Sequence, residues 1–152
     1  MAVLETSKSA VYGLTYGPGV ARQLICDAVV VACATTGIDN ADDDVGLLWV
    51  PKNAVIVSAQ FHCTDMDSGT ALVWDVGDVD DEDRLFSDVT TGQTATSTMA
   101  MATTAFLYKY TARTQLRAYI STAAGTAVAG TLYFAVQYFV DADFSRTALV
   151  AA

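Results

Sequence analysis

The chain has 152 residues and a formal charge of −9 at pH 7, to which aspartate contributes most. This length suits one domain with a real core, because two half-sized domains would be marginal without metal or disulfide cross-links. The acidic charge repels phosphate, which excludes nucleic acid and anionic membrane as favoured partners.

The first nineteen residues predict an extended arm that ends in a turn. Two aromatic residues lie among glycines and a proline in Tyr12-Gly-Leu-Thr-Tyr-Gly-Pro-Gly19, which is typical of an extended segment and not of a packed element. Residues 20–34 then read as a long strand, bent near Asp27. We therefore expect an arm over residues 1–19 and a single β-sandwich domain over residues 20–152.

The next elements are predicted to be short strands separated by turns. An acidic loop over residues 35–44 leads to a strand over residues 45–50, which Pro51 stops because it cannot donate a ladder hydrogen bond. Residues 54–64 alternate between apolar and polar side chains and predict a half-buried strand. Residues 70–76 alternate likewise, so we expect these two strands to form a hairpin.

The most acidic segment, residues 77–88, predicts an irregular loop with a single helical turn. Three carboxylates at alternating positions could supply oxygen ligands to a hard cation such as Ca²⁺: Asp78, Asp80 and Glu82. The run lacks the glycine and the terminal bidentate glutamate of a helix–loop–helix calcium site. We therefore expect a solvated loop in which Arg84 pairs with Asp80 or Asp83, and no bound metal or cofactor.

The last third of the chain carries the clearest strand patterns. After a weakly patterned stretch over residues 90–104, alternation over residues 106–110, 116–120 and 132–140 predicts an antiparallel meander. The chain thus has about eight predicted strands and no βαβ alternation. Abundant Val, Thr and aromatic residues, against two Glu and three Lys, also favour sheet over helix. The predicted fold is all-β, an antiparallel sandwich or jelly roll.

No arrangement of residues suggests catalysis. The single histidine, His62, lies next to Cys63, and adjacent residues of a strand point to opposite faces, so the two cannot form a nucleophile–base pair. With Cys26 and Cys33, Cys63 makes an odd number of cysteines without C-x-x-C spacing. We expect buried, reduced thiols in a protein made in the cytosol, and no enzymatic activity.

Three stretches resemble a group of small virion proteins of tailed phages: Leu48-Trp-Val-Pro-Lys-Asn-Ala-Val-Ile-Val-Ser-Ala59, Thr70-Ala-Leu-Val-Trp-Asp-Val-Gly-Asp78 and Asp83-Arg-Leu-Phe86. The ending Tyr138-Phe-Val-Asp141 is similar to their tyrosine-rich last strand. The resemblance spans residues 45–143 and departs from the group where Leu85 separates Arg84 from Phe86. It implies a decoration or cement protein, often trimeric, that sits at junctions between major capsid subunits.

Two functions follow from this reading. The resemblance implies a structural protein, made in the host cytoplasm, that binds the major capsid protein on the outer surface of the virion. We expect it to be a homo-oligomer, a trimer in preference to a dimer. The candidate contact residues are Tyr12, Leu14, Tyr16, Trp49, Tyr138 and Phe139. The alternative is a receptor- or glycan-binding sandwich of a phage tail or spike, which predicts an exposed Trp or Tyr beside Asp in a surface groove.

Overall fold

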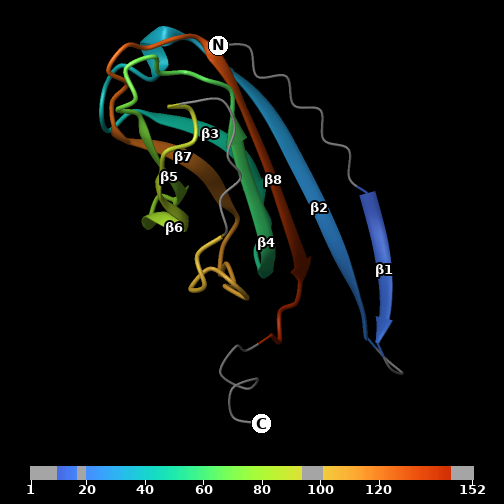
Figure 1. The fold of residues 1–152 in the computed structure, drawn as a ribbon. Helices are drawn as coiled ribbons and strands as arrows, with labels where there is room; N and C mark the ends of the chain where they lie inside the picture. The colour runs from blue at the N-terminus through green and yellow to red at the C-terminus, as the bar shows by residue number, and fades with distance from the viewer. Residues whose placement is uncertain (1–9, 17–19, 94–100, 145–152) are drawn as a thin grey trace.

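A computed structural model describes the backbone of residues 10–16, 20–93 and 101–144, with side chains from residue 23 onward. Two antiparallel four-stranded sheets make up the two layers of the molecule (Figure 1). The strands within the described residues are β1 (Ala10–Tyr16), β2 (Val20–Cys33), β3 (Asp44–Val50), β4 (Ala54–Cys63), β5 (Val73–Asp78), β6 (Asp81–Val89), β7 (Thr114–Thr122) and β8 (Gly130–Val140). The one helix among the described residues is a short 3₁₀ helix, Thr35–Gly37, which is far too short to cross a bilayer. The predicted all-β sandwich is confirmed.

The order of the strands is that of a jelly roll. One sheet runs β1-β2-β8-β4 and the other β3-β7-β5-β6, so each sheet combines strands from both halves of the chain. Residues 107–110 extend the first sheet beyond β4. The Leu107 N–H donates to the Ile56 carbonyl at 2.8 Å, and the Tyr110 N–H donates to the Ala54 carbonyl at 2.9 Å.

Two predicted strand pairings are wrong. The strand at residues 54–63 does not form a hairpin with the next one, because β4 pairs with β8 whereas β5 pairs with β6 and β7 in the opposite sheet. The predicted C-terminal meander is also absent, since β7 and β8 lie in different sheets. Both predictions assumed that neighbours in sequence pair with each other, whereas in a jelly roll the chain crosses between sheets.

The segment over residues 77–88 is not the predicted loop with a helical turn but a tight hairpin. Asp78 pairs with Asp81, leaving two residues for the turn between β5 and β6. Gly77 allows the strands to approach closely, because a Cβ there would lie 2.1 Å from the Asp81 carbonyl oxygen. Arg84 pairs with Asp78 and Asp81, not with Asp80 or Asp83 as predicted.

Aromatic and aliphatic side chains fill the space between the two sheets. Phe61 of β4 meets Trp74 of β5 edge to face, with ring centroids 6.0 Å apart, and it also contacts Phe86 of β6. All three rings are almost completely buried. Because each large ring buries roughly 150–250 Å², this cluster supplies much of the apolar burial that holds the layers together.

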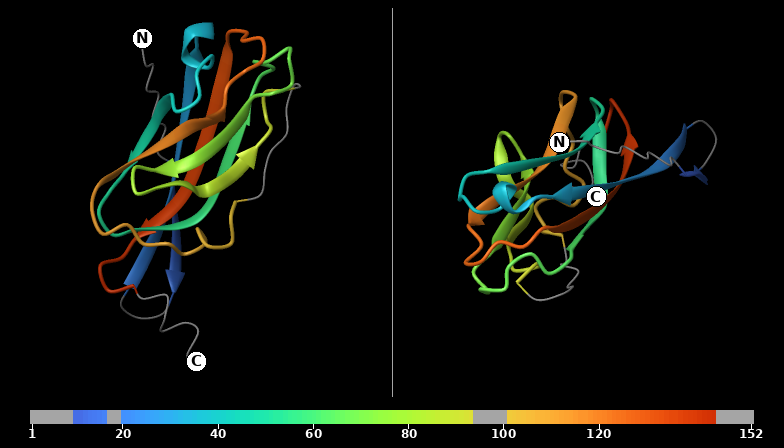
Figure 2. Two further views of the ribbon diagram at one scale, coloured as in Figure 1. Left: turned by 90° about the vertical axis from the view of Figure 1, so that its left-hand side faces the viewer. Right: turned by 90° about the horizontal axis from the view of Figure 1, so that it is seen from above.

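The N-terminal segment is extended, as predicted, but it is also a strand of the sheet. β1 pairs with β2 over seven consecutive positions, from Ala10 opposite Cys26 to Tyr16 opposite Val20. β8 pairs with β2 only from Ile25 onward. The first part of β2 and β1 therefore form a two-stranded ribbon that extends beyond the body of the sandwich (Figure 2). The division into an arm and one body domain stays a prediction.

Candidate functional site

The outer face of the β2-β8-β4 sheet carries no acidic residue, lysine or arginine over the region where the three strands pair. Its side chains alternate with buried ones such as Val29 and Phe134, which point into the core. We call this surface the uncharged face; its residues are Cys26, Ala28, Val30, Ala32, Ser58, Gln60, His62, Thr131, Tyr133, Ala135 and Gln137.

Register places these residues in rows across the strands. Val30, Tyr133 and His62 form one such row. The rings of Tyr133 and His62 contact each other, with centroids 5.5 Å apart. Val30 is 44% exposed and Tyr133 is 42% exposed. A shallow depression of about 170 Å³ lies beside them and is lined by apolar residues together with Gln60 and His62. The arrangement suits contact with another uncharged protein surface.

The outer face of the opposite sheet is strongly acidic. A depression of about 420 Å³ there is lined by four carboxylates and one guanidinium, those of Asp42, Asp44, Asp75, Glu82 and Arg117. Arg117 forms an ion pair with Asp44. We call this surface the acidic face. The remaining negative charge fits a basic protein surface better than an acidic one.

Trp49 lies at the rim between the two sheets and is 45% exposed. It shares a depression of about 190 Å³ with Asp27 and Arg113. The Arg113 guanidinium stacks over the indole ring, with its Cζ atom 4.4 Å from the ring centroid. An exposed Trp beside Asp in a depression is what the glycan-binding alternative predicts, although a sugar ring that stacked on this indole face would have to displace the guanidinium.

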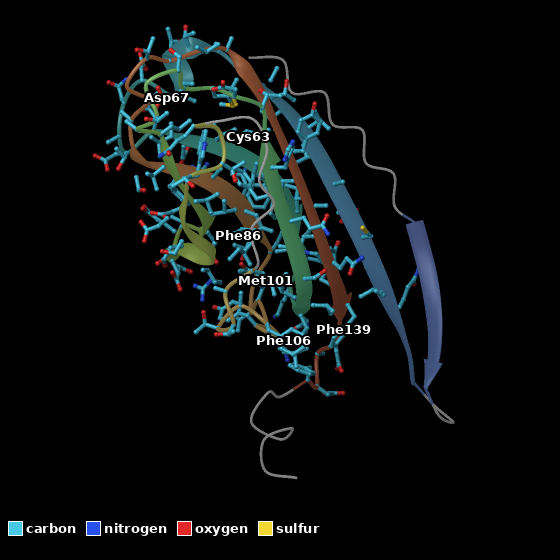
Figure 3. The ribbon with its side chains drawn as sticks, in the orientation of Figure 1. Cys63, Asp67, Phe86, Met101, Phe106 and Phe139 are labelled. Atoms are coloured by element: carbon cyan, nitrogen blue, oxygen red, sulfur yellow. The ribbon has the colours of Figure 1, made fainter. Side chains whose placement is uncertain are left out.

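Two of the predicted contact residues are buried by the chain itself. Tyr138 is 4% exposed, because it points into the sandwich and donates a hydrogen bond to Asp27 Oδ2 at 2.7 Å. Phe139 lies on the opposite face of β8, at the end of the strand shown in Figure 3, where Phe144 covers it edge to face at 5.5 Å. Neither side chain offers a docking surface, and this part of the prediction is corrected.

The remaining predicted contact residues lie in β1. Tyr12, Leu14 and Tyr16 occupy alternate positions of the strand, and the side chains of β1 lie outside the described part of the structure. Alternate positions of a strand share one face. Tyr12 pairs with Leu24, Leu14 with Arg22 and Tyr16 with Val20. Their role as contact residues stays a prediction.

The sheet edges differ in how they are protected against pairing with another chain. The β4 edge is covered by residues 107–110, and the β3 edge is interrupted by a bulge between Gly46 and Trp49. The β6 edge carries four consecutive charged residues, Asp81 to Arg84. Cover, bulges and charge are the usual protections of an edge strand. β1 has none of them: it is uncharged, unbulged and unpaired on its outer side among the described residues.

The three predicted candidate metal ligands do not form a site. Asp78 is buried and accepts hydrogen bonds from Arg84 and Tyr110, whereas Asp80 and Glu82 are exposed. Over the described residues, no group of three or more His, Cys, Asp or Glu side chains could hold a metal ion. The alternation of Trp74, Val76 and Asp78 along β5 is the signal in the sequence that Asp78 points inward.

The thiols of Cys33 and Cys63 are buried between the sheets. Burial raises the pKa of Cys33 to about 11 and that of Cys63 to about 12. Only the thiolate is nucleophilic, and at pH 8 a thiol with a pKa near 11 is ionised in roughly one molecule in a thousand. Neither thiol is therefore poised for chemistry.

We expect alkylation to show this protection. In the native protein at pH 8, Cys33 and Cys63 should react with iodoacetamide at least about a hundredfold more slowly than in the denatured chain, as followed by peptide mass spectrometry. Denaturation in guanidinium should make all three cysteines reactive and serves as the control. Labelling of either buried thiol at the denatured rate would contradict the structure.

Comparison with known proteins finds solved structures with a similar fold, although no family model matches the sequence. No protein-family model matches the chain, and no curated protein sequence matches it. Its structure is similar to a chain in the capsid asymmetric unit of cyanophage Pam1, with 26% sequence identity and a TM-score of 0.72. The match covers 84% of this chain and 92% of that one. This chain shares its fold with a phage capsid chain. A chain of the capsid of Ralstonia phage GP4 supports the fold as well, with 23% identity, a TM-score of 0.65 and coverage of 86% and 92%.

Proposed function

We propose that this protein is a structural virion protein that decorates the outer surface of a phage capsid and stabilises it by binding the major capsid protein. The observation that carries the proposal is the likeness to the Pam1 capsid chain, which extends over 92% of that chain. The sequence resemblance to small tailed-phage virion proteins points in the same direction. We further propose that the protein acts as a homotrimer, because capsids are symmetric and a trimer fits a three-fold site.

Surface features of the described residues support contact with a shell. The open edge of β1 can add a strand from a partner, which gives affinity through main-chain hydrogen bonds. The acidic face can meet a basic patch on the shell. Many identical weak contacts over one particle would hold the protein in place through avidity.

Electron microscopy of the virions of the phage that encodes this chain tests the location. The proposal predicts density for the jelly roll in many symmetric copies over the shell. Density at a few copies on the tail would instead favour the receptor-binding alternative. Removal of the protein should lower the temperature at which the shells release their contents.

A substitution at the open edge tests how the shell is bound. Thr15→Lys places a charge on β1, a device that natural edge strands use against strand addition. We expect its binding to shells that lack the protein to be about tenfold weaker in a co-sedimentation assay, a change of about 1.4 kcal/mol. Thr122→Lys, at an exposed position at the end of β7, adds the same charge elsewhere and should bind as the wild type does. Equal binding of the two variants would contradict a role for the β1 edge.

A further inference from the structure

We propose that the uncharged face is the surface through which copies of this chain contact one another. The inference rests on the proposed function, in which many copies act together on one particle, and it deepens that function by naming the face and its partner. Val30 and Tyr133 would lie at the centre of the contact.

Charge is distributed unequally over the two outer faces, which favours contact between copies through the uncharged face. The chain bears a net charge of −9, so two copies repel each other unless their acidic surfaces are kept apart. Asp44, Asp75 and Glu82 line the acidic face, on the outer side of the β3-β7-β5-β6 sheet. The uncharged face lies on the outer side of the other sheet. Copies that meet through it therefore hold their acidic faces on the far sides of two sandwiches.

The residue types of the uncharged face also suit a contact between two copies. The core of a protein interface is depleted in charged residues and enriched in aromatic ones, because burying an unpaired charge is costly. Tyr133 supplies an exposed ring beside the depression. Ala28, Ala32 and Ala135 keep the surrounding surface low, which lets a second backbone approach closely. Gln60 and His62 offer polar atoms for hydrogen bonds at its margin.

The same charges argue against the shell protein as the occupant of this face. A partner of opposite charge would gain most from the acidic face, which offers carboxylates, and nothing in electrostatic energy from the uncharged face. A second copy, in contrast, is repelled by the acidic face and is matched by a surface that is as uncharged as its own.

A pair of charge-adding variants tests the assignment. Val30→Asp puts a carboxylate at the centre of the uncharged face, and Val79→Asp puts one at the turn of the β5–β6 hairpin, where the native side chain is 79% exposed. Both positions are exposed in the monomer, so both variants should fold, with circular dichroism and thermal unfolding as checks. Tyr133→Glu provides a second variant in the face if Val30→Asp does not fold.

Sedimentation equilibrium of the purified full chain gives the readout. We expect the wild type and Val79→Asp to be oligomeric at micromolar concentration. The variant in the face should have a dissociation constant raised at least about a hundredfold, because each contact would bury a carboxylate without a partner. A monomeric wild type would overturn the inference, and so would an oligomer unchanged by both variants in the face.

Shell binding by the same variants separates this inference from the proposed function. If Val30→Asp keeps the oligomer intact but loses shell binding, the face belongs to the shell protein and the inference is overturned while the proposed function stands. If Val30→Asp dissociates the oligomer and the wild type does not bind shells, the inference stands and the proposed function fails. Val79→Asp is the control for the oligomer alone, because Val79 lines the depression of the acidic face that is proposed to meet the shell. Thr122→Lys is the control for shell binding.

Discussion

Replacing Asp67 with alanine is expected to lower the free energy of unfolding by about 2–4 kcal/mol, since a hydrogen bond to a charged group contributes about 1.5–3 kcal/mol and a buried N–H left without a partner costs about 1–3 kcal/mol. The Asp67 side chain is completely buried in the segment that crosses from β4 to β5 (Figure 3). Its carboxylate accepts four short hydrogen bonds of 2.6–2.8 Å, from the backbone N–H groups of Gly69, Ala71, Leu72 and Thr126. It thereby fixes the crossover to the loop before β8.

Denaturant unfolding of the variant measures the loss. Asp65→Ala is the matched control, because Asp65 lies two residues away, is exposed, and accepts a single long bond of 3.3 Å. We expect the control to lose less than about 1 kcal/mol, as most surface substitutions do. An Asp67→Ala variant as stable as the control would show that this carboxylate does not organise the crossover.

The same carboxylate makes stability depend on pH. Burial by itself would raise the pKa of Asp67, but hydrogen bonds from Thr126, Ala71 and Leu72 outweigh burial and hold the pKa well below its ordinary value. A carboxyl whose pKa is lowered on folding stabilises the fold above its unfolded pKa of about 3.9 and loses this effect as pH falls towards the folded pKa. The stability difference between wild type and Asp67→Asn should therefore be constant near pH 7 and shrink below about pH 4.

Replacing Arg84 with methionine is expected to cost about 3–5 kcal/mol, because it leaves a buried carboxylate without its counter-charge. Asp78 is 1% exposed, and its Oδ2 atom accepts from Arg84 Nε at 2.6 Å and from the Tyr110 hydroxyl at 2.9 Å. The guanidinium also packs on Tyr108, 4.0 Å from the ring centroid. Through its contacts with Tyr108 and Tyr110, the ion pair of the β5–β6 hairpin is thus joined to the segment that extends the other sheet.

A double-mutant cycle separates the pair from its surroundings. Asp78→Leu with Arg84→Met removes both charges, and the double variant should lose clearly less stability than the sum of the two single variants. Asp81→Asn removes the second partner of Arg84, a half-buried carboxylate at 3.3 Å whose side chain is 40% exposed. An ion pair that is open to solvent on one side contributes about 0–1 kcal/mol, so this control should lose far less stability than Arg84→Met. Additive losses in the cycle would mean that the two charges do not depend on each other.

The sequence predicted the strands much better than their partners. Alternation along residues 54–64 located β4 to within one residue, and Pro51 marked the end of β3. Which strands pair could not be predicted, because a period of two residues fixes which side chains share a face but not which strand lies alongside. In this fold β8 lies between β2 and β4, and no local pattern of residues shows that.

The candidate surface was predicted only in part. Trp49 is exposed as expected, but Tyr138 is buried, and its alternation with Leu132, Phe134 and Val136 already indicated an inward side chain. Val30 and Tyr133 were not identified. The available signal was the lack of charge at every second position of β8 and, from Cys26 onward, of β2, which becomes a surface only when the two strands are known to be paired.

The position of β8 also determines when the protein can fold during synthesis. β8 is the last of the described strands to be translated, yet it is a central strand of its sheet and pairs with both β2 and β4. Until Val140 has left the ribosome, those two earlier strands lack the hydrogen-bonding partner that joins them, and the apolar residues facing the core stay open to water. Domains built from such distant pairings gain little from folding in stages, because the entropy of closing long loops is lost before contacts compensate for it. The nascent chain thus has to remain unaggregated until β8 emerges, and only then can it close the sandwich.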